Sequence, residues 1–352
     1  MQLKDLRKKI DIIDKKILSL LNQRAEEVIR VNKLKKRDNL EIFSSERESL
    51  ILDRLKKTNK GPLLSEDIDL IFKEVLSVCR SLRKGLRIVY LGPEGTFTHL
   101  AAIRKFGKKP QYIPAESINE IFEKVEREEA EYGVVPIENS IEGVVNYTLD
   151  MFLASNLKIC SEISMNISHS LLGTSSKSLK RIYSNPQVFA QCRKWIGRNM
   201  PNIDLVATAS TAKAALAVKK DSQGACIGNK ILANIYGLRV IASSIEDFSS
   251  NITRFLVIAR NDSSASGRDK TSILFSIKDK VGALHDSLAA FKRCGINLTK
   301  IESRPSKKKA WDYYFFVDFQ GHRSLPAVQK VLKSLEKRCT FVKILGSYPR
   351  ES

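Results

Sequence analysis

The sequence of 352 residues predicts a chain of three segments: an all-α helical bundle, an α/β segment and an α+β, ferredoxin-like unit. Three observations support this fold class. Residues 3–38 contain no Pro or Gly and carry apolar residues at helical spacing. From Gly85 to about Ile258, short β-branched runs alternate with helical stretches. Beyond residue 261 the pattern follows the order βαββαβ, which is typical of a ferredoxin-like unit.

The first segment is dominated by one long predicted helix, residues 3–38. Its apolar stripe consists of Leu6, Ile10, Ile13, Ile17, Leu20, Leu21, Val28 and Val31. At 1.5 Å per residue this helix would be about 54 Å long, which is too long for an ordinary small globule. Two shorter helices are expected at about 44–57 and 65–84, with a break at residues 60–62. The length of the first helix suggests that two chains share one bundle.

A stretch rich in Ser, Asp and Gly, residues 261–270, is the clearest linker in the chain. Before it, strands are expected at 86–91 and 132–136. Beyond it, the sequence predicts strands at 271–278, 296–304, 311–319 and 340–346, with helices at 282–293 and 325–337. The domains are accordingly predicted at residues 1–85, 86–260 and 268–348.

The formal net charge of +21 is unevenly distributed: residues 1–90 carry +8, residues 91–262 carry +3 and residues 263–352 carry +10. A strongly basic chain raises the hypothesis of nucleic-acid binding. However, the basic residues are interleaved with acids, and no arginine-rich run with aromatic residues occurs. We therefore expect no nucleic-acid partner. Steering of a small polyanionic substrate, or a merely solvated surface, explains the charge as well.

Other features of the composition predict a cytoplasmic chain without a metal or cofactor. No apolar run approaches the roughly 20 residues that cross a bilayer, and no signal-peptide pattern follows Met1. The six cysteines lie far apart without a C-x-x-C pair, as expected for reduced thiols. The four histidines have no metal-ligand spacing with one another or with a cysteine.

Cationic residues stand along the first predicted helix. Arg24 and Lys35 are eleven residues apart, so they share a face, and their separation of about 16 Å could be closed around a small dicarboxylate. Arg7 and Arg24 are seventeen residues, or about 25 Å, apart. No small ligand bridges that distance, so if both serve one site, one of them comes from another subunit. The alternative is a solvated, salt-bridged helix face.

The pattern of these residues, from Leu6-Arg7 through Arg24 and Lys35 to Glu46-Arg47-Glu48, resembles the all-helical chorismate mutase family over residues 1–84. The resemblance implies an intertwined dimer in which Arg24 and the partner's Arg7 hold the substrate carboxylates. Lys35 would donate to the ether oxygen, Glu48 would bind the ring hydroxyl, and Arg47 would support the site. Such a rearrangement needs a bound conformer and a positive field rather than a nucleophile. The remaining site positions are Ser44, Cys79 and Arg83; Ser44 and Arg83 depart from the usual residues, so their part stays open.

Three stretches carry the information in the middle segment: Leu91-Gly-Pro-Glu-Gly-Thr-Phe-Thr98, Gly133-Val-Val-Pro-Ile-Glu-Asn-Ser140 and Asn251-Ile-Thr-Arg-Phe255. The first could be an anion-binding helix N-terminus, but it is neither a Walker loop nor a Rossmann fingerprint. In this order and spacing the three resemble the prephenate dehydratase family over about residues 87–260, which implies two α/β lobes with the substrate between them. Thr253 would be the proton donor and Arg254 a carboxylate partner, in a preorganised, water-poor site. The cleft would be lined by Glu138, Asn139, Ser140, Ser210 and Thr211.

The last segment holds Gly282-Ala283-Leu284 at its first strand-to-helix turn and Glu302-Ser303-Arg304-Pro305 after its second strand. A glycine at a helix N-terminus allows close approach of a ligand carboxylate, although ordinary turn chemistry is the alternative. Both motifs resemble the regulatory ACT domain of prephenate dehydratases, in which phenylalanine binds between paired domains. The resemblance implies feedback inhibition by L-phenylalanine.

The full chain thus resembles the bifunctional enzymes of phenylalanine biosynthesis known as P-proteins. It implies rearrangement of chorismate to prephenate, followed by decarboxylation and dehydration of prephenate to phenylpyruvate. Two alternatives remain: a dehydratase that prefers arogenate, and a non-catalytic binding protein that senses phenylalanine.

Overall fold

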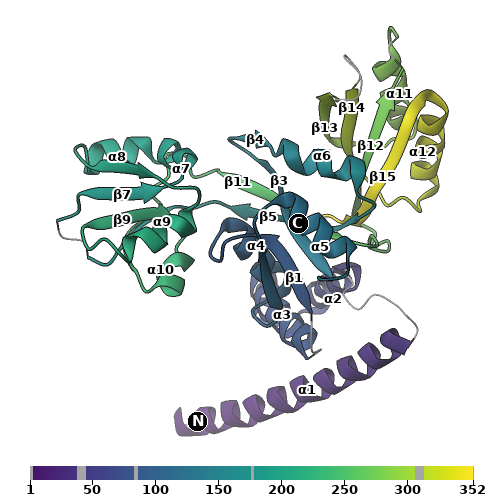
Figure 1. The fold of residues 1–352 in the computed structure, drawn as a ribbon. Coiled ribbons are helices and arrows are strands. Elements are labelled where there is room, and N and C mark those ends of the chain that lie inside the picture. Colours follow the sequence, from purple (N-terminus) through teal and green to yellow (C-terminus); the bar gives the residue numbers. More distant parts are fainter. Residues whose placement is uncertain are drawn as a thin grey trace. The chain divides into compact units, whose positions relative to one another are not determined.

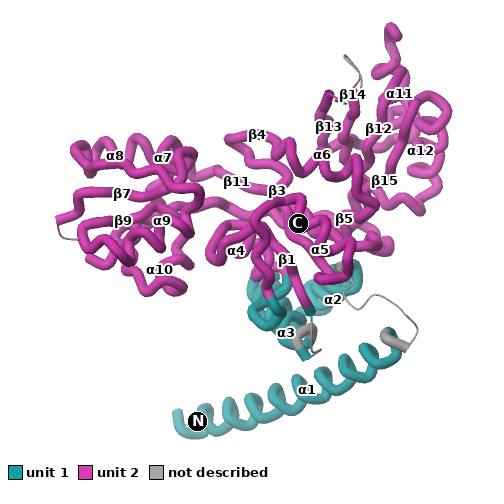
Figure 2. Tube along the Cα trace, in the orientation of Figure 1, with its two compact units in different colours: residues 1–86, 106–111 teal, residues 87–105, 112–352 magenta. Residues whose placement is uncertain are grey.

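The computed structural model describes residues 3–37, 45–82, 86–175, 178–278, 280–305 and 313–351, which belong to two compact units (Figure 2). The first unit comprises residues 1–86 and 106–111, and the second comprises residues 87–105 and 112–352. The α/β segment and the C-terminal βαββαβ segment therefore belong to the same compact unit.

The first unit consists of the helices α1 (Leu3–Arg37), α2 (Ser45–Thr58) and α3 (Ser65–Ser81). The predicted long helix is confirmed, since α1 runs unbroken for 35 residues. An ion pair of 2.8 Å between Lys56 Nζ and Asp69 Oδ1 joins α2 to α3. The apolar stripe of α1 is open to solvent: Ile10 is 56% exposed, Ile13 53% and Ile17 49%. The described residues of this chain therefore leave that stripe largely uncovered.

The second unit begins with a six-stranded sheet in the order β2-β1-β3-β11-β5, with β4 paired to β3; we call this sheet and its helices the first lobe. Its strands are β1 (Arg87–Leu91), β2 (Gln111–Ala115), β3 (Tyr132–Asn139), β4 (Gly143–Val144), β5 (Lys158–Asn166) and β11 (Ile252–Ala259). Its helices are α4 (Phe97–Phe106), α5 (Ile118–Glu126) and α6 (Asn146–Ala154). Strand β11, which returns from the second lobe, pairs antiparallel with both β3 and β5.

The second lobe is a five-stranded sheet in the order β10-β6-β9-β7-β8. Its strands are β6 (Ser170–Gly173), β7 (Arg181–Ser184), β8 (Asp204–Ala207), β9 (Gly224–Gly228) and β10 (Arg239–Ser243). Helices α7 (Pro186–Gln191) and α8 (Arg193–Asn199) cover one face, and α9 (Thr211–Val218) and α10 (Ile231–Tyr236) cover the other (Figure 1). Because both faces are covered, the central strand β9 is buried along its whole length.

Two short crossing segments, residues 167–169 and 244–251, connect the lobes. They are hydrogen-bonded to each other and to the strands beside them: Ile167 N donates to Asn251 O at 2.8 Å, and Ile245 N donates to His169 O at 3.0 Å. The two crossings therefore form one junction, and β11 begins where this junction ends.

The C-terminal sheet has four strands in the order β13-β14-β12-β15. They are β12 (Asp269–Ile277), β13 (Leu298–Pro305), β14 (Tyr313–Gln320) and β15 (Cys339–Pro349), and the two helices are α11 (Ala283–Arg293) and α12 (Pro326–Arg338). The predicted order of elements is found, with boundaries that differ by at most three residues. One face of this sheet packs under the two helices through Phe275, Phe291 and Phe319.

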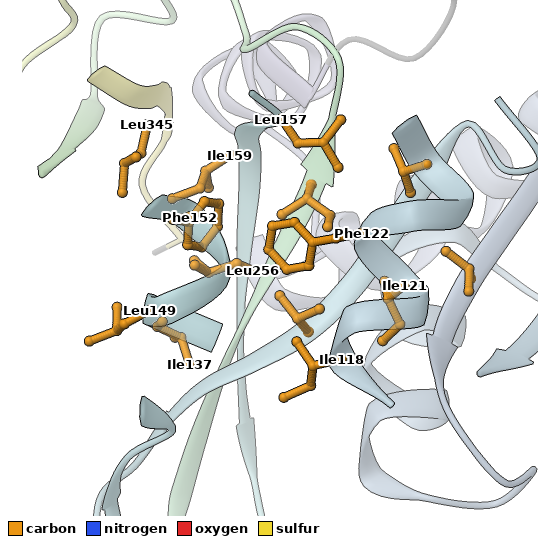
Figure 3. Packing of buried hydrophobic residues seen from close by; sticks show 14 of the residues in the cluster. Ile118, Ile121, Phe122, Ile137, Leu149, Phe152, Leu157, Ile159, Leu256 and Leu345 are labelled. Atoms are coloured by element: carbon orange, nitrogen blue, oxygen red, sulfur yellow. The ribbon is translucent and has the colours of Figure 1, made fainter. Parts of the chain in front are cut away.

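The opposite face of the C-terminal sheet packs on the first lobe. Leu274, Phe316 and Leu345 belong to the same hydrophobic cluster as Phe152 and Ile159 of the first lobe (Figure 3). The predicted linker is also held on both sides, because Ser263 donates from its backbone N to Ser347 O at 3.1 Å and from its Oγ to Cys160 O at 2.7 Å. The first lobe and the C-terminal sheet consequently share one core.

This shared core leads to a prediction about stability. Phe316 is fully buried, so Phe316→Ala should lower the free energy of unfolding by about 3–5 kcal/mol, because it opens a cavity between the sheet and the first lobe. Ile301→Ala is the matched control: this side chain is 44% exposed, and we expect a loss of about 0.5 kcal/mol. Urea unfolding followed by circular dichroism measures both. Equal losses for the two variants would contradict a shared core.

Candidate active sites and ligand-binding region

In the first unit, the structure brings two of the predicted site residues together. Arg24 Nη1, on α1, donates to Cys79 Sγ, on α3, at 2.8 Å, and Cys79 is only 6% exposed. Lys35 lies near the C-terminal end of α1, and Glu48 lies in the first turn of α2, where a carboxylate is favoured by the helix dipole. The contact with Cys79 places Arg24 on the side of α1 that faces α3.

Two other predicted mutase residues, Arg7 and Arg47, have exposed side chains. Arg7 lies near the N-terminal end of α1, and Arg47 lies on α2. Ser44 and Arg83 lie outside the described residues. The sequence-based expectation that Arg7 serves the site of another subunit stays a prediction.

Three of the predicted dehydratase residues, Asn139, Ser140 and Thr253, gather where β11 begins at the junction. Asn139 Nδ2, at the end of β3, donates to Thr253 Oγ1 at 2.7 Å and to Asn251 Oδ1 at 2.6 Å. Asn139 Oδ1 in turn accepts hydrogen bonds from the backbone N of Ile141 and of Glu142. The orientation of the Asn139 amide is thus determined by four partners. Because Thr253 Oγ1 accepts from Asn139, its own proton is available to be donated elsewhere.

Ser140 ties the same region to the junction. Its Oγ donates to Ser250 O at 3.2 Å and accepts from Ile252 N at 2.9 Å. Two consecutive predicted residues, Asn139 and Ser140, therefore hold Thr253 and the three residues that precede it.

Sequence reasoning did not select the polar residues that continue this network into the second lobe. Asn251 Nδ2 donates to Gln191 Oε1 at 3.3 Å, the same oxygen lies 2.8 Å from His169 Nε2, and Gln191 Nε2 donates to Glu142 Oε1 at 3.0 Å. His169 is 1% exposed, and burial lowers its pKa, so its ring is neutral. His169 lies in the short segment that connects β5 to β6, and no local sequence pattern marks it as part of this network.

Ser210 and Thr211 belong to the second lobe, at the start of α9. Ser210 Oγ caps this helix by accepting from Lys213 N at 3.1 Å, and Thr211 is 7% exposed. Asn185 Nδ2 donates to the neighbouring Ala209 O at 3.3 Å, which joins the loop before α7 to the loop before α9. These loops form one edge of the second lobe.

The glycine-containing loop after β1 is also attached to the second lobe. Asn229 Nδ2 donates to Gly95 O at 2.6 Å, and Tyr236 Oη donates to Glu94 O at 3.1 Å. Gly95 has φ of +88°, and a Cβ there would lie 2.5 Å from Leu232 Cδ2, so both the backbone and the packing require glycine.

The side chain of Arg254 lies on the opposite face of the sheet from the side chain of Thr253. Its guanidinium does not lie beside Thr253: Nε donates to Glu162 Oε2 at 2.8 Å, Nη1 donates to Asp318 Oδ2 at 2.6 Å, and Nη2 donates to Tyr348 Oη at 3.0 Å. Successive side chains of a strand point to opposite faces of its sheet. Thr253 therefore faces Asn139, while Arg254 faces the C-terminal sheet.

The side chain of Glu138 lies on the same face of the sheet as the side chain of Arg254. The register pairs Arg254 with Glu138 and Thr253 with Asn139. The Glu138 carboxylate is paired with Lys300 Nζ and lies 3.4 Å from Arg254 Nη1. The expectation that Glu138 lines the cleft stays a prediction; its ion-pair partners in the structure, Arg254 and Lys300, lie at the contact between the first lobe and the C-terminal sheet.

The predicted ligand-binding motifs of the last segment lie on the C-terminal sheet and its first helix. Gly282 caps α11 with φ of +75°, and a Cβ added there would meet no atom within 4 Å. Ala283 is buried, whereas Leu284 packs against the core under the helices. In β13, Glu302 and Arg304 alternate with the exposed Ser303 and Pro305. Arg304 Nη2 donates to Asp150 Oδ1, on α6, at 3.0 Å, so this residue contacts the first lobe.

The described residues contain no group of three or more His, Cys, Asp and Glu side chains arranged to hold a metal ion. Within the same residues, no helix is both long and apolar enough to cross a membrane. All six cysteines are described and are free thiols, and burial raises the pKa of Cys192 and of Cys226 to about 12.

Comparisons with known proteins cover the whole chain. Residues 6–84 match the family model of chorismate mutase type II, residues 88–263 match prephenate dehydratase, and residues 271–337 match the ACT domain. A bifunctional chorismate mutase/prephenate dehydratase of Aquifex aeolicus is 47% identical over 99% of this chain and 98% of that protein. One of Stutzerimonas stutzeri is 43% identical over 99% and 98%.

A similar solved structure is the crystal structure of an Arthrobacter aurescens prephenate dehydratase in complex with L-Phe. The similarity covers 75% of the present chain and 90% of the Arthrobacter chain. The TM-score is 0.70 and the identity is 34%. The three family models match the helical unit, the two lobes and the C-terminal sheet in turn, and the bifunctional relatives match them all in one chain. The chain therefore belongs to the family of bifunctional chorismate mutase/prephenate dehydratases.

Proposed function

We propose that this chain rearranges chorismate to prephenate in its helical unit and converts prephenate to phenylpyruvate between its two lobes. The observation that carries the second assignment is the contact between Asn139 Nδ2 and Thr253 Oγ1 at 2.7 Å. It leaves the threonine hydroxyl as a donor at the start of β11, where the junction meets both lobes. Following phenylpyruvate after chorismate is added to the purified protein tests both assignments together.

For the mutase, we propose an intertwined dimer in which α1 helices from two chains pack together. The exposed apolar stripe of α1 supports this, because contiguous apolar surface of this extent is rarely left in water. Arg24 and Lys35 would act from one chain and Arg7 from the partner. Glu48 would bind the ring hydroxyl of the substrate. Arg47, Cys79 and the undescribed Ser44 and Arg83 would complete the surroundings.

For the dehydratase, the reaction breaks the bond from the ring to the carboxyl carbon and the bond from the ring to the hydroxyl. The electron pair of the first bond enters the ring, which becomes aromatic, and the departing hydroxide takes a proton to become water. Thr253 would donate a hydrogen bond to that hydroxyl; a threonine is a weak acid, so its effect depends on a fixed position. Asn139 and Ser140 hold that position, and Ser210 and Thr211 would bind substrate from the second lobe.

For regulation, we propose that L-phenylalanine binds the C-terminal, ferredoxin-like ACT domain and inhibits the dehydratase. The βαββαβ order, the positive φ of Gly282 and the space around it support a ligand that approaches the N-terminus of α11. The similar Arthrobacter enzyme was solved with L-Phe. A purely non-catalytic sensor is not favoured, because the chain matches both enzyme models. Comparing kcat/KM for prephenate and arogenate decides the substrate preference.

The first functional prediction concerns Lys35. Lys35→Ala should lower mutase kcat about a hundredfold, because it removes a donor to the ether oxygen in the transition state. Dehydratase activity should stay unchanged, since that site lies in the other unit. Lys33→Ala, a neighbouring exposed lysine on the same helix, is the control and should be active in both assays. Parallel loss of both activities in a folded Lys35→Ala protein would contradict two separate sites.

A second prediction tests the dimer. Arg7→Ala and Arg24→Ala chains should each be nearly inactive as mutases, and mixing them should restore activity, because a mixed dimer contains one intact site. The two residues are about 25 Å apart along α1, too far for one small substrate. The measurement is mutase activity after subunit exchange, with mixed dimers verified by mass spectrometry. Mixed dimers without activity would show that Arg7 does not act across subunits.

A third prediction separates Thr253 from its surroundings. Thr253→Ala should lower dehydratase kcat by about two orders of magnitude with little change in KM for prephenate. Thr253→Ser keeps the hydroxyl and should retain far more activity. If Thr253→Ala equals the wild type at saturating prephenate, this residue has no part in the reaction.

A further inference from the structure

Strand β11 contains two adjacent residues, Thr253 and Arg254, whose side chains lie on opposite faces of the sheet. Thr253 meets Asn139 on the face toward the proposed active site, and Arg254 meets Glu162 and Asp318 on the face toward the C-terminal sheet. One peptide bond joins the two residues. A displacement of Arg254 along or across the strand therefore also displaces the Thr253 hydroxyl.

Arg254 is the centre of a group of six charged side chains, which we call the interdomain charge cluster; five of them are at most 13% exposed and Glu138 is 32% exposed. The first lobe contributes Arg254, Glu138 and Glu162, and the C-terminal sheet contributes Lys270, Lys300 and Asp318. The hydroxyl groups of Ser272 and Tyr348 complete it, at 2.5 Å from Asp318 Oδ1 and 3.0 Å from Arg254 Nη2. All four strands of the C-terminal sheet thus supply a member.

The charges of the cluster are complementary. The first lobe brings one cation and two anions, a net charge of −1, and the C-terminal sheet brings two cations and one anion, a net charge of +1. Burial by itself would raise the pKa of Glu162, but Arg254 and Lys270 outweigh it, and the pKa lies below its ordinary value. Buried ions are tolerated only when their partners stay in place. These charges therefore stay paired only while the C-terminal sheet packs on the first lobe in this position.

The cluster also reaches the proposed phenylalanine site. Lys300, which pairs with Glu138, stands on β13 two residues before Glu302, so both share one strand with the motif at 302–305. A ligand that shifts β13 changes the position of Lys300, and through Glu138 and Arg254 the shift reaches β11. The same register holds Glu138 opposite Arg254 and Asn139 opposite Thr253.

We propose that Arg254 is a positioning residue of the dehydratase, which links the seating of the C-terminal sheet to the placement of Thr253. Arg254 transmits the effect of an amino acid bound to that sheet, and this part of the proposal rests on the proposed function. A ligand inhibits only if it binds better to the arrangement with the misplaced hydroxyl. A misplacement of about 1 Å is enough to lower a rate by up to a hundredfold.

Arg254→Lys is the main variant, because it keeps the charge but loses the planar fork that reaches Glu162, Asp318 and Tyr348 together. Lys300→Gln is the second, milder variant, in case Arg254→Lys does not fold. Arg323→Gln is the matched control: Arg323 lies in the loop between β14 and α12, and its ion pair of 2.9 Å with Asp262 joins this loop to residues 261–270 without involving a residue of β11. For each, dehydratase kcat and KM, inhibition by L-phenylalanine, its binding by calorimetry and mutase activity are measured on the full-length protein.

We expect Arg254→Lys to lower dehydratase kcat at least tenfold with KM changed less than about threefold, and to leave mutase activity unchanged. Both cluster variants should bind L-phenylalanine within about threefold of the wild type and yet lose most of the inhibition, whereas Arg323→Gln should be inhibited normally. A purely structural role would lower the melting temperature without separating binding from inhibition.

Folded cluster variants with the kcat and the inhibition of the wild type would overturn the proposal and leave the proposed function intact. A wild-type enzyme that neither binds nor responds to L-phenylalanine would overturn the proposed regulation and this coupling together. A wild type without dehydratase activity would overturn the assignment of Thr253 itself. The wild-type assays thus distinguish failure of the function from failure of the coupling.

Discussion

The burial of one guanidinium constrains much of the second unit. Arg254 is 8% exposed and is surrounded by carboxylates from β3, β5 and β14. A charge in such a place is stable only with partners at hydrogen-bonding distance, so three strands and a second sheet must meet at one point. That requirement holds the register of β11 between its neighbours. It also determines which face of the first lobe packs on the C-terminal sheet.

The apolar packing around this point has the complementary role. Buried side chains of the first lobe and of the C-terminal sheet, including Phe152, Phe316 and Leu345, form one cluster. Apolar contacts supply the larger share of the free energy of such a contact but are not directional. The charged side chains determine the orientation in which the two surfaces meet. The C-terminal sheet has its own separate core under α11 and α12, so the proposed response to a ligand would need only a small change in how the sheet packs on the first lobe.

The helical unit differs from the second unit because it leaves much of its apolar surface unpacked. Its long helix has little packing within the described part of its own chain, and its apolar stripe is exposed. An isolated amphipathic helix gains most of its stability from the surface it packs against. In the proposed dimer the mutase site would depend on a second chain for packing and for a cation, whereas the proposed dehydratase site would be assembled from residues of a single chain around the junction between the lobes.

The amino-acid sequence by itself determined the three segments, the unbroken first helix and the βαββαβ order, and it singled out Thr253 and Asn139, whose contact came only from the structure. These follow from local periodicity, from the absence of Pro and Gly, and from motifs whose spacing resembles known families. Only the tertiary structure decided where Arg254 and Glu138 point, and that His169 and Gln191 extend the network into the second lobe. Alternation along a strand separates Thr253 from Arg254, but it does not say which face meets substrate and which meets another sheet. That choice depends on residues far away in the chain, such as Asp318 and Tyr348, whose contact with β11 has no signature in local sequence.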